Sequence, residues 1–188
     1  MASRIVIEKI GSEEELRKGA TAEELSVVEQ FGSASRRCEV MAWRAVVRRE
    51  LGDEVAVSHD EYGAPIVDAL NTFIGVSHSR ERVAVIFSDR ECAIDIESTE
   101  RNFRRVAPHY LSAVEQSIAE QNDLYAEMWC TKEALYKYYK KGGVDFVKDI
   151  SVRKYDEHRS VLICSILEGE TIDVKIKREG SLVIAVID

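Results

Sequence analysis

The segment from Ala93 to Glu97 alternates acidic and apolar side chains in its last four residues. On a β-strand successive side chains point to opposite faces, so Asp95 and Glu97 are predicted to share one face, opposite the isoleucines Ile94 and Ile96. Two carboxylates held side by side repel each other unless a positive charge lies between them. Carboxylate oxygens are ligands for hard divalent cations such as magnesium. The segment therefore predicts either a magnesium site or an amphipathic strand with a solvated acidic face.

A second group of chemically capable side chains lies between Trp129 and Lys137. Residues four apart stack on one side of a helix, so Trp129, Glu133 and Lys137 are predicted to line one stripe. A Glu followed four positions later by a Lys is ordinarily a surface ion pair that contributes roughly 0.3–0.5 kcal/mol. The tryptophan argues against a plain surface, which leaves an ion pair and a functional stripe as alternatives.

Ser77, His78 and Ser79 form a third polar cluster, at the end of a predicted strand. Hydroxyl and imidazole groups at a strand end can donate hydrogen bonds to phosphate oxygens, and the alternative is a polar strand end with an exposed histidine. The three residues are adjacent in the chain, which gives no reason to expect the geometry of a hydrolytic triad.

Residues 35–51 show the periodicity of an amphipathic helix that ends at Gly52. Its apolar stripe consists of Val40, Trp43, Val47 and Leu51. The cations Arg37, Arg44 and Arg48 lie on a neighbouring stripe. Three cations are therefore predicted to share one side of this helix.

The remaining pattern predicts an α+β fold with antiparallel sheets and two lobes of similar size. Predicted strands cover residues 5–7, 54–58, 73–76, 83–87, 92–97, 160–167, 171–176 and 181–187, and predicted helices lie within 12–30, 104–120 and 123–141. The polar segment from Asp89 to Glu91 is the predicted boundary, which gives an N-terminal lobe of residues 1–90 and a C-terminal lobe of residues 91–188.

Composition excludes several classes of protein. The chain has 188 residues, 45% of them apolar and 32% charged, with a net charge of −8. This is enough apolar material for a core, and the acidic balance argues against nucleic-acid binding. The longest apolar runs are far shorter than the roughly 20 residues of a membrane-spanning helix, and no secretion signal is recognisable. The widely spaced cysteines are typical of free thiols, so we expect a cytoplasmic protein with no membrane partner.

Four motifs follow the basic helix in a fixed order. They are Glu61-Tyr62-Gly63-Ala64-Pro65, Val76-Ser77-His78-Ser79, Ala93-Ile94-Asp95-Ile96-Glu97 and the segment Trp129–Lys137. This order resembles the 4′-phosphopantetheinyl transferase superfamily, specifically its two-lobed, monomeric, surfactin-synthetase-activating class. The resemblance covers roughly residues 36–142, most of the chain.

The resemblance implies two pseudo-symmetric lobes, each a small antiparallel sheet packed with helices, with the active site in the cleft between them. It implies that the 4′-phosphopantetheine arm of coenzyme A is transferred to a serine hydroxyl of an apo acyl or peptidyl carrier protein. The other product is adenosine 3′,5′-bisphosphate, and the reaction depends on Mg²⁺. Such enzymes serve fatty-acid, polyketide or nonribosomal peptide biosynthesis.

The family's functional residues carry over by position. The metal ligands correspond to Asp95, Glu97 and Glu133, and the catalytic pair is Glu133, as candidate base, with Lys137. Coenzyme A contacts correspond to Ser77, His78, Lys137 and one of the two arginines Arg36 and Arg37. Ala64 stands where many relatives have Lys, and Ala93 replaces a Gly, so one cationic contact and the space around the nucleotide differ from the family pattern.

Two other interpretations remain at this stage. The chain can be a non-catalytic coenzyme A or nucleotide-binding relative on the same fold, or an interaction module whose charged stripes are surface only. Carrier proteins are acidic, so an enzyme of net charge −8 needs local basic patches to attract them. The candidate patches are Lys137, Lys140 and Lys141, and Arg101, Arg104 and Arg105; each is either a docking surface or solvated charge.

Overall fold

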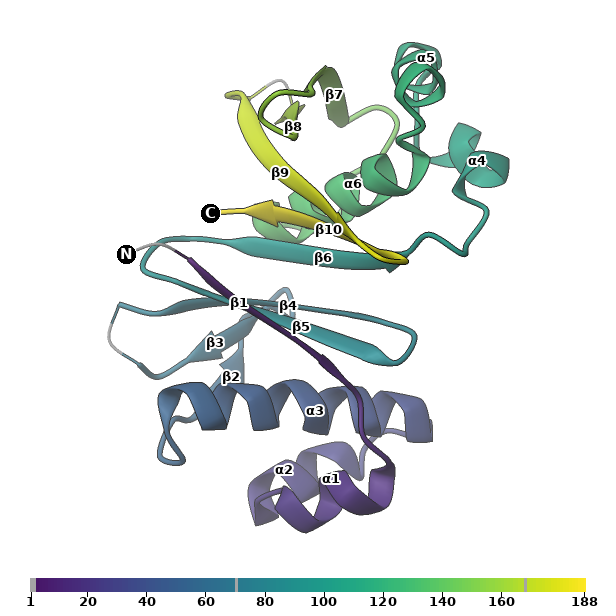
Figure 1. Ribbon diagram of the computed structural model, residues 1–188. Coiled ribbons are helices and arrows are strands. Elements are labelled where there is room, and N and C mark those ends of the chain that lie inside the picture. Colours follow the sequence, from purple (N-terminus) through teal and green to yellow (C-terminus); the bar gives the residue numbers. More distant parts are fainter. Residues whose placement is uncertain (1–2, 70, 168) are drawn as a thin grey trace. The chain divides into compact units, whose positions relative to one another are not determined.

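The computed structural model describes residues 3–69, 71–167 and 169–188. The chain divides into two compact units, Met1–Arg90 and Glu91–Asp188 (Figure 1). Both combine helices with antiparallel strands, as the sequence predicts, and the fold is α+β. Within the described residues, no helix has both the length and the apolar character needed to cross a membrane.

The N-terminal unit is built on one long helix and a three-stranded sheet. Its elements are β1 (Arg4–Lys9), α1 (Glu13–Gly19), α2 (Ala22–Val28), α3 (Ala34–Leu51), β2 (Val57–His59), β3 (Pro65–Val67), β4 (Phe73–Ser79) and β5 (Arg82–Ser88). The sheet has the order β1-β5-β4 with antiparallel pairing, and β2 and β3 form a separate hairpin.

Helix α3 lies between the sheet and the two short helices (Figure 1). Its apolar stripe packs against the face of β5 that carries Val83, Val85 and Phe87. Helices α1 and α2 begin at capping boxes, in which Ser12 and Thr21 each accept from the backbone of a glutamate three residues on. The predicted helix over residues 35–51 is thereby confirmed, including its end at Gly52.

The C-terminal unit packs helices on one five-stranded antiparallel sheet. Its elements are β6 (Ala93–Ser98), α4 (Phe103–Val106), the 3₁₀ turn η1 (Ala107–His109), α5 (Ala113–Asn122), α6 (Tyr125–Tyr139), β7 (Ile150–Asp156), β8 (Val161–Ile166), β9 (Ile172–Glu179) and β10 (Leu182–Ile187). The strand order is β6-β10-β9-β8-β7, so β6 is an edge strand of this sheet and β10 pairs with it.

The helix predicted over residues 104–120 is wrong in one respect, because the segment forms three short elements. Pro108 lacks a backbone N–H and falls in the 3₁₀ turn, and Ser112 starts a new helix with a capping box to Glu115. Strand β7 was not predicted, because its exposed positions carry charged and polar residues in an irregular pattern. Helix α6 ends at Tyr139, before Gly142 and Gly143.

Helix α6 is anchored on the sheet by fully buried residues. Met128, Cys130, Ala134 and Leu135 are all inaccessible to solvent and belong to the core of this unit, together with Val183 and Ala185 of β10. This packing fixes the rotation of the helix. The neighbouring stripe of Trp129, Glu133 and Lys137 is consequently held over β6.

Candidate functional site

The two carboxylates of β6 lie on the face of the sheet that α6 covers. Asp95 pairs with Ala185 and Glu97 with Val183, and residues paired across antiparallel strands share a face. Asp95 is only 5% exposed, and Ile94 and Ile96 on the opposite face are also buried. The predicted alternation of acidic and apolar side chains on the two faces of β6 is confirmed. Both faces are buried at Asp95, so the alternative of a solvated acidic face does not hold for this residue.

Helix α6 supplies a hydrogen-bond donor to each carboxylate. Lys137 Nζ donates to Asp95 Oδ1 at 2.7 Å and to the carbonyl of Ile94 at 3.3 Å. Trp129 Nε1 donates to Glu97 Oε1 at 3.1 Å. Trp129 and Lys137 are two helical turns apart, a rise of about 12 Å, whereas Asp95 and Glu97 are about 6.7 Å apart along the strand. The two donors therefore reach the acids of β6 from opposite ends of the stripe that contains Glu133.

Glu133 lies between Trp129 and Lys137 along α6, and its pKa is affected by both acids of β6. Burial raises the pKa of Glu133, and the negative charges of Asp95 and Glu97 raise it further, while Lys137 opposes the shift. The charges of Asp95 and Glu97 are thus close enough to Glu133 to disfavour its ionisation. A site of this kind attracts cations and holds a carboxylate of increased basicity.

The donor set fits a hard divalent cation, because all three side chains offer carboxylate oxygens that repel one another. In the part of the chain that the structure describes, no group of three His, Cys, Asp or Glu side chains is arranged to hold a metal ion. The Asp95 carboxylate accepts a hydrogen bond from Lys137. The Glu97 carboxylate accepts from Trp129 and from Arg101, whose Nη1 lies 2.6 Å from Glu97 Oε1. A metal would require these side chains to exchange partners.

A pocket of about 640 Å³ opens beside Glu133. Its lining consists of His109, Tyr110, Trp129, Glu133, Asp145, Phe146, Val147 and Lys148. Most of its exposed surface is apolar, and its lining includes the rings of Trp129 and Phe146. The pocket can take an elongated, mainly uncharged group whose end reaches the Glu133 carboxylate.

In the N-terminal unit the structure brings Arg36 and His78 together from α3 and β4. Arg36 Nη1 lies 3.0 Å from His78 Nε2, and both side chains lie within 3.4 Å of Glu39. Arg36 and His78 are exposed, so both are accessible to a ligand. Ser77 is 2% exposed, which turns its side chain away from solvent.

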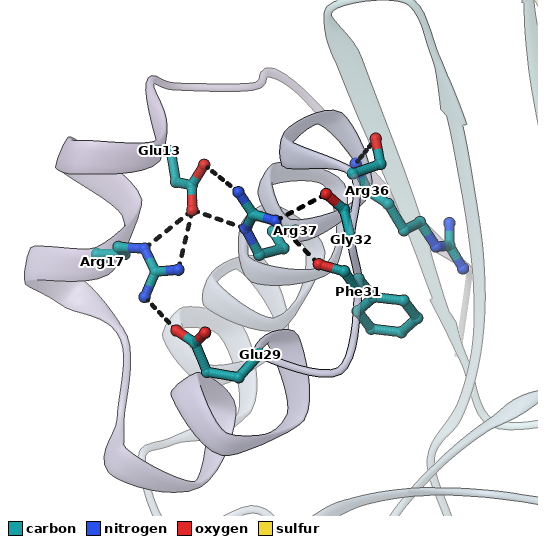
Figure 2. A network of polar contacts seen from close by, with 8 residues as sticks. Glu13, Arg17, Glu29, Phe31, Gly32, Arg36 and Arg37 are labelled. Atoms are coloured by element: carbon teal, nitrogen blue, oxygen red, sulfur yellow. Dashed lines mark hydrogen bonds and ion pairs between the residues drawn. The ribbon is translucent and has the colours of Figure 1, made fainter.

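Arg37 occupies a different environment from Arg36 (Figure 2). Its guanidinium binds both carboxylate oxygens of Glu13 at 2.8 and 3.0 Å and also donates to the carbonyls of Phe31 and Gly32. Arg17 joins the same cluster by bonding Glu13 and Glu29. Figure 2 shows Arg36 extending away from this network. Of the two arginines that the sequence offered, Arg36 is thus the accessible one, and Arg37 ties α1 to α3.

Arg44 was not singled out as a site residue by the sequence, although it lies on the predicted basic stripe. It is 4% exposed, and its Nε has no hydrogen-bond partner among the described residues. Burial lowers the pKa of Arg44, and the pKa of His59 is lowered by burial and by the positive charges of Arg44 and Arg36. Arg44 and Arg36 thus both act on His59, while Glu23 and Glu24 oppose the lowering of the Arg44 pKa and Asp60 opposes that of His59.

Lys132, next to Glu133 in the chain, has a structural role. Its side chain is fully buried, and Nζ bonds Glu115 at 2.8 Å and the carbonyls of Phe146 and Ile150. Burial lowers its pKa, while Glu115 opposes that shift. Lys132 thus fastens α6 to α5 and to the segment around Phe146, which lines the pocket.

Comparisons with known proteins identify the family of this chain. The family model described as the 4′-phosphopantetheinyl transferase superfamily matches residues 91–187. The 4′-phosphopantetheinyl transferase Sfp of Bacillus subtilis (strain 168) is 28% identical over 124 residues, which cover 61% of this chain and 55% of that protein. The 4′-phosphopantetheinyl transferase ffp of Bacillus subtilis is 29% identical over 113 residues, which cover 56% and 50%. This chain thus spans about half the length of the curated relatives it matches. By the match to its C-terminal unit and to these relatives, the chain belongs to the 4′-phosphopantetheinyl transferase superfamily and resembles its Sfp-like class.

Proposed function

We propose that this protein transfers the 4′-phosphopantetheine arm of coenzyme A to a serine hydroxyl of an apo acyl or peptidyl carrier protein and releases adenosine 3′,5′-bisphosphate. The observation that carries the proposal is the meeting of β6 and α6. Lys137 contacts Asp95 across 42 positions of sequence, and Glu133 responds electrostatically to Asp95 and Glu97. These contacts support the proposal that Asp95, Glu97, Glu133 and Lys137 act together as one site.

Asp95, Glu97 and Glu133 would hold Mg²⁺, which supplies charge neutralisation at the pyrophosphate of coenzyme A when bound. Lys137 places a further positive charge beside Asp95, where it can contact a pyrophosphate oxygen. Because both phosphates of the scissile bond are anionic, this positive charge lowers the repulsion that the incoming serine oxygen meets.

Glu133 is the candidate base for the serine proton, directly or through a water molecule. Its raised pKa makes it a stronger proton acceptor than an ordinary surface glutamate. General base catalysis typically contributes about 10²- to 10⁴-fold in rate. The proton leaves the carrier serine as its oxygen bonds the phosphorus of the arm, and the bond to the bridging oxygen of the leaving nucleotide breaks.

The pocket beside Glu133 suits the pantetheine arm, which is long and largely uncharged. Trp129 and Phe146 offer apolar surface along it, and Glu133 marks the reacting end. Arg36 and His78 would bind the phosphates of the nucleotide end, with Arg44 adding positive charge to the same helix. Binding energy at that end would serve to position the reacting phosphate.

The test is to incubate the protein with coenzyme A, Mg²⁺ and several apo carrier proteins and to follow the carrier by mass spectrometry. We expect the mass of one phosphopantetheine arm to be added at a serine, with loss of the addition in chelator. Magnesium-dependent binding of coenzyme A without transfer to any carrier would instead support a non-catalytic coenzyme A-binding relative. Size measurement in the same buffer tests the expected monomer.

A further inference from the structure

One carboxylate oxygen in the cluster, Glu97 Oε1, receives two donors of different character. Trp129 Nε1 donates from 3.1 Å, and Arg101 Nη1 from 2.6 Å. The Glu97 side chain is 13% exposed, so it needs a counter-charge as long as it is ionised beside Asp95. The surroundings of the two donors indicate which of them can leave.

Trp129 is held in place by packing. Its ring meets Tyr110 edge-on with centroids 5.1 Å apart, and it also contacts Phe146 at 5.9 Å and Phe103 at 6.0 Å. Moving the indole would break these ring contacts, which stabilise its position beyond the effect of the area buried. Trp129 is thus a fixed donor that keeps Glu97 aimed at the cluster.

Arg101 is more exposed than Trp129. It lies in the turn after β6, its side chain is 51% exposed, and its guanidinium rests over the rings of Phe103 at 4.9 Å and Trp129 at 5.8 Å. Because half of the side chain already meets solvent, the guanidinium can turn into water, and it then loses the ion pair to Glu97 and the two ring contacts.

We propose that Arg101 is a placeholder for the divalent cation. In the metal-free protein the Arg101 guanidinium neutralises the Glu97 carboxylate. When the cation binds, Arg101 releases Glu97, while Trp129 remains in place. The inference rests on the proposed metal site of Asp95, Glu97 and Glu133. Arg101 is accordingly a positioning residue, which lowers metal affinity and stabilises the metal-free cluster.

The experiment uses Mn²⁺ alone, without coenzyme A, on the full chain. Affinity is measured from the electron paramagnetic resonance signal of the free ion, and stability without metal from the urea midpoint. Arg101→Gln should bind Mn²⁺ about three- to tenfold more tightly than the unmodified protein and should unfold at lower urea concentration. Arg101→Lys, which keeps the charge, should lie between. Arg153→Gln removes an exposed arginine from β7 and should leave the Mn²⁺ affinity within twofold.

For a placeholder, Arg101→Gln increases Mn²⁺ affinity and lowers the urea midpoint. Loss of a merely structural residue would lower both the Mn²⁺ affinity and the urea midpoint. The placeholder role of Arg101 is overturned if Arg101→Gln binds Mn²⁺ no more tightly than the unmodified protein. The metal site itself still stands in that case, provided that the unmodified protein binds Mn²⁺ and Glu97→Gln does not. If the unmodified protein binds no Mn²⁺, or if Glu97→Gln binds Mn²⁺ as tightly as the unmodified protein, the proposed metal site is wrong. The placeholder role of Arg101 is then wrong as well.

Discussion

Asp95 is nearly completely buried and is paired with a side chain from a distant element, as a buried carboxylate requires. Lys137 Nζ lies 2.7 Å from its Oδ1, and the residue is 5% exposed. Asp95→Asn keeps the shape and removes the charge, so it should reduce arm transfer by about 10²-fold or more. Circular dichroism checks that the fold persists. Glu157→Gln, in an exposed turn, is the control for loss of an acid and should transfer normally. Near-normal transfer by Asp95→Asn would contradict the metal assignment.

Arg36 and Arg37 are neighbours in the chain with separable roles, which provides a matched pair of variants (Figure 2). Arg36→Ala should raise the KM for coenzyme A about tenfold, because it removes a charge-assisted contact to phosphate, and should leave the urea midpoint nearly unchanged. Arg37→Ala should do the reverse, lowering the midpoint with little effect on KM, since it detaches Glu13. If both variants changed KM equally, the assignment of Arg36 would be wrong.

At residue scale, the sequence predicted three site acids, which stay a prediction, and left the choice between the two arginines open. Motif matching identifies Asp95, Glu97, Glu133 and Lys137 because their spacing is fixed by one strand and one helix. The difference between Arg36 and Arg37 depends on Glu13, which lies 24 positions away from Arg37 and has no pattern that marks it as a partner. Arg44 escaped notice for the same reason, because burial is a tertiary property.

At the scale of elements, α1 is docked on α3 by ion pairs rather than by buried apolar residues; no residue of α1 is buried. Hydrogen bonds from Arg37 and Arg17 lower the pKa of Glu13 from 4.5 to about 2. Because the folded pKa is below the unfolded one, the stabilisation is fully present above pH 4.5 and is lost as the pH falls through about 2.

The corresponding measurement is an NMR titration of the Glu13 side-chain carboxyl. We expect a midpoint near pH 2 in the unmodified protein and a shift back towards 4.5 in Arg37→Met. A Glu13 that titrates near 4.5 in the unmodified protein would mean that α1 is not held by these contacts in solution.

Helix α6 depends on Lys132, whose buried ammonium links it to α5 and to the start of β7. Lys132→Met should lower the free energy of unfolding by about 3–5 kcal/mol, because it leaves Glu115 and two carbonyls buried without their cation. Adding Glu115→Gln should recover part of the loss, and Lys154→Met on the exposed side of β7 should change stability by less than about 0.5 kcal/mol. A small loss for Lys132→Met would show that water reaches Glu115.

Secondary structure was predictable where one local signal dominates. The capping boxes at Ser12 and Thr21 and the apolar stripe of α3 gave correct helices. The prediction of one continuous helix over residues 104–120 was wrong. It relied on the helix-forming composition of the segment and did not take account of Pro108 and Ser112, where the chain changes element. Strand β7 was missed because tertiary pairing with β8, and not its own alternation, makes it a strand.

For the whole molecule, charge sets the conditions under which an acidic carrier can approach. The chain carries a net charge of −8, so any attraction must be local. Arg104 is 67% exposed but already bonds Glu120, and Lys140 lies 3.7 Å from Glu91, so both candidate patches are partly neutralised. The basic side of the C-terminal unit is weaker than the sequence alone suggests.

Arg104→Glu should lower kcat/KM for the carrier about fivefold at low ionic strength and by less than about twofold at high salt, with KM for coenzyme A unchanged. The rate is measured at several carrier concentrations in each buffer. Lys154→Glu makes the same charge change on β7 and should have little effect. Equal rates for Arg104→Glu and the unmodified protein would remove this patch from carrier recognition.

Strand β10 runs between β6 and β9 and consists of Leu182, Val183, Ile184, Ala185, Val186 and Ile187, all of them buried. Six consecutive residues without charge, proline or glycine and with high strand propensity are prone to self-association once they are exposed. Heating this protein would therefore tend to end in irreversible aggregation through the strand that supports the candidate site. Its conformational stability should be determined in urea at low protein concentration, where the released strand stays in solution long enough to refold.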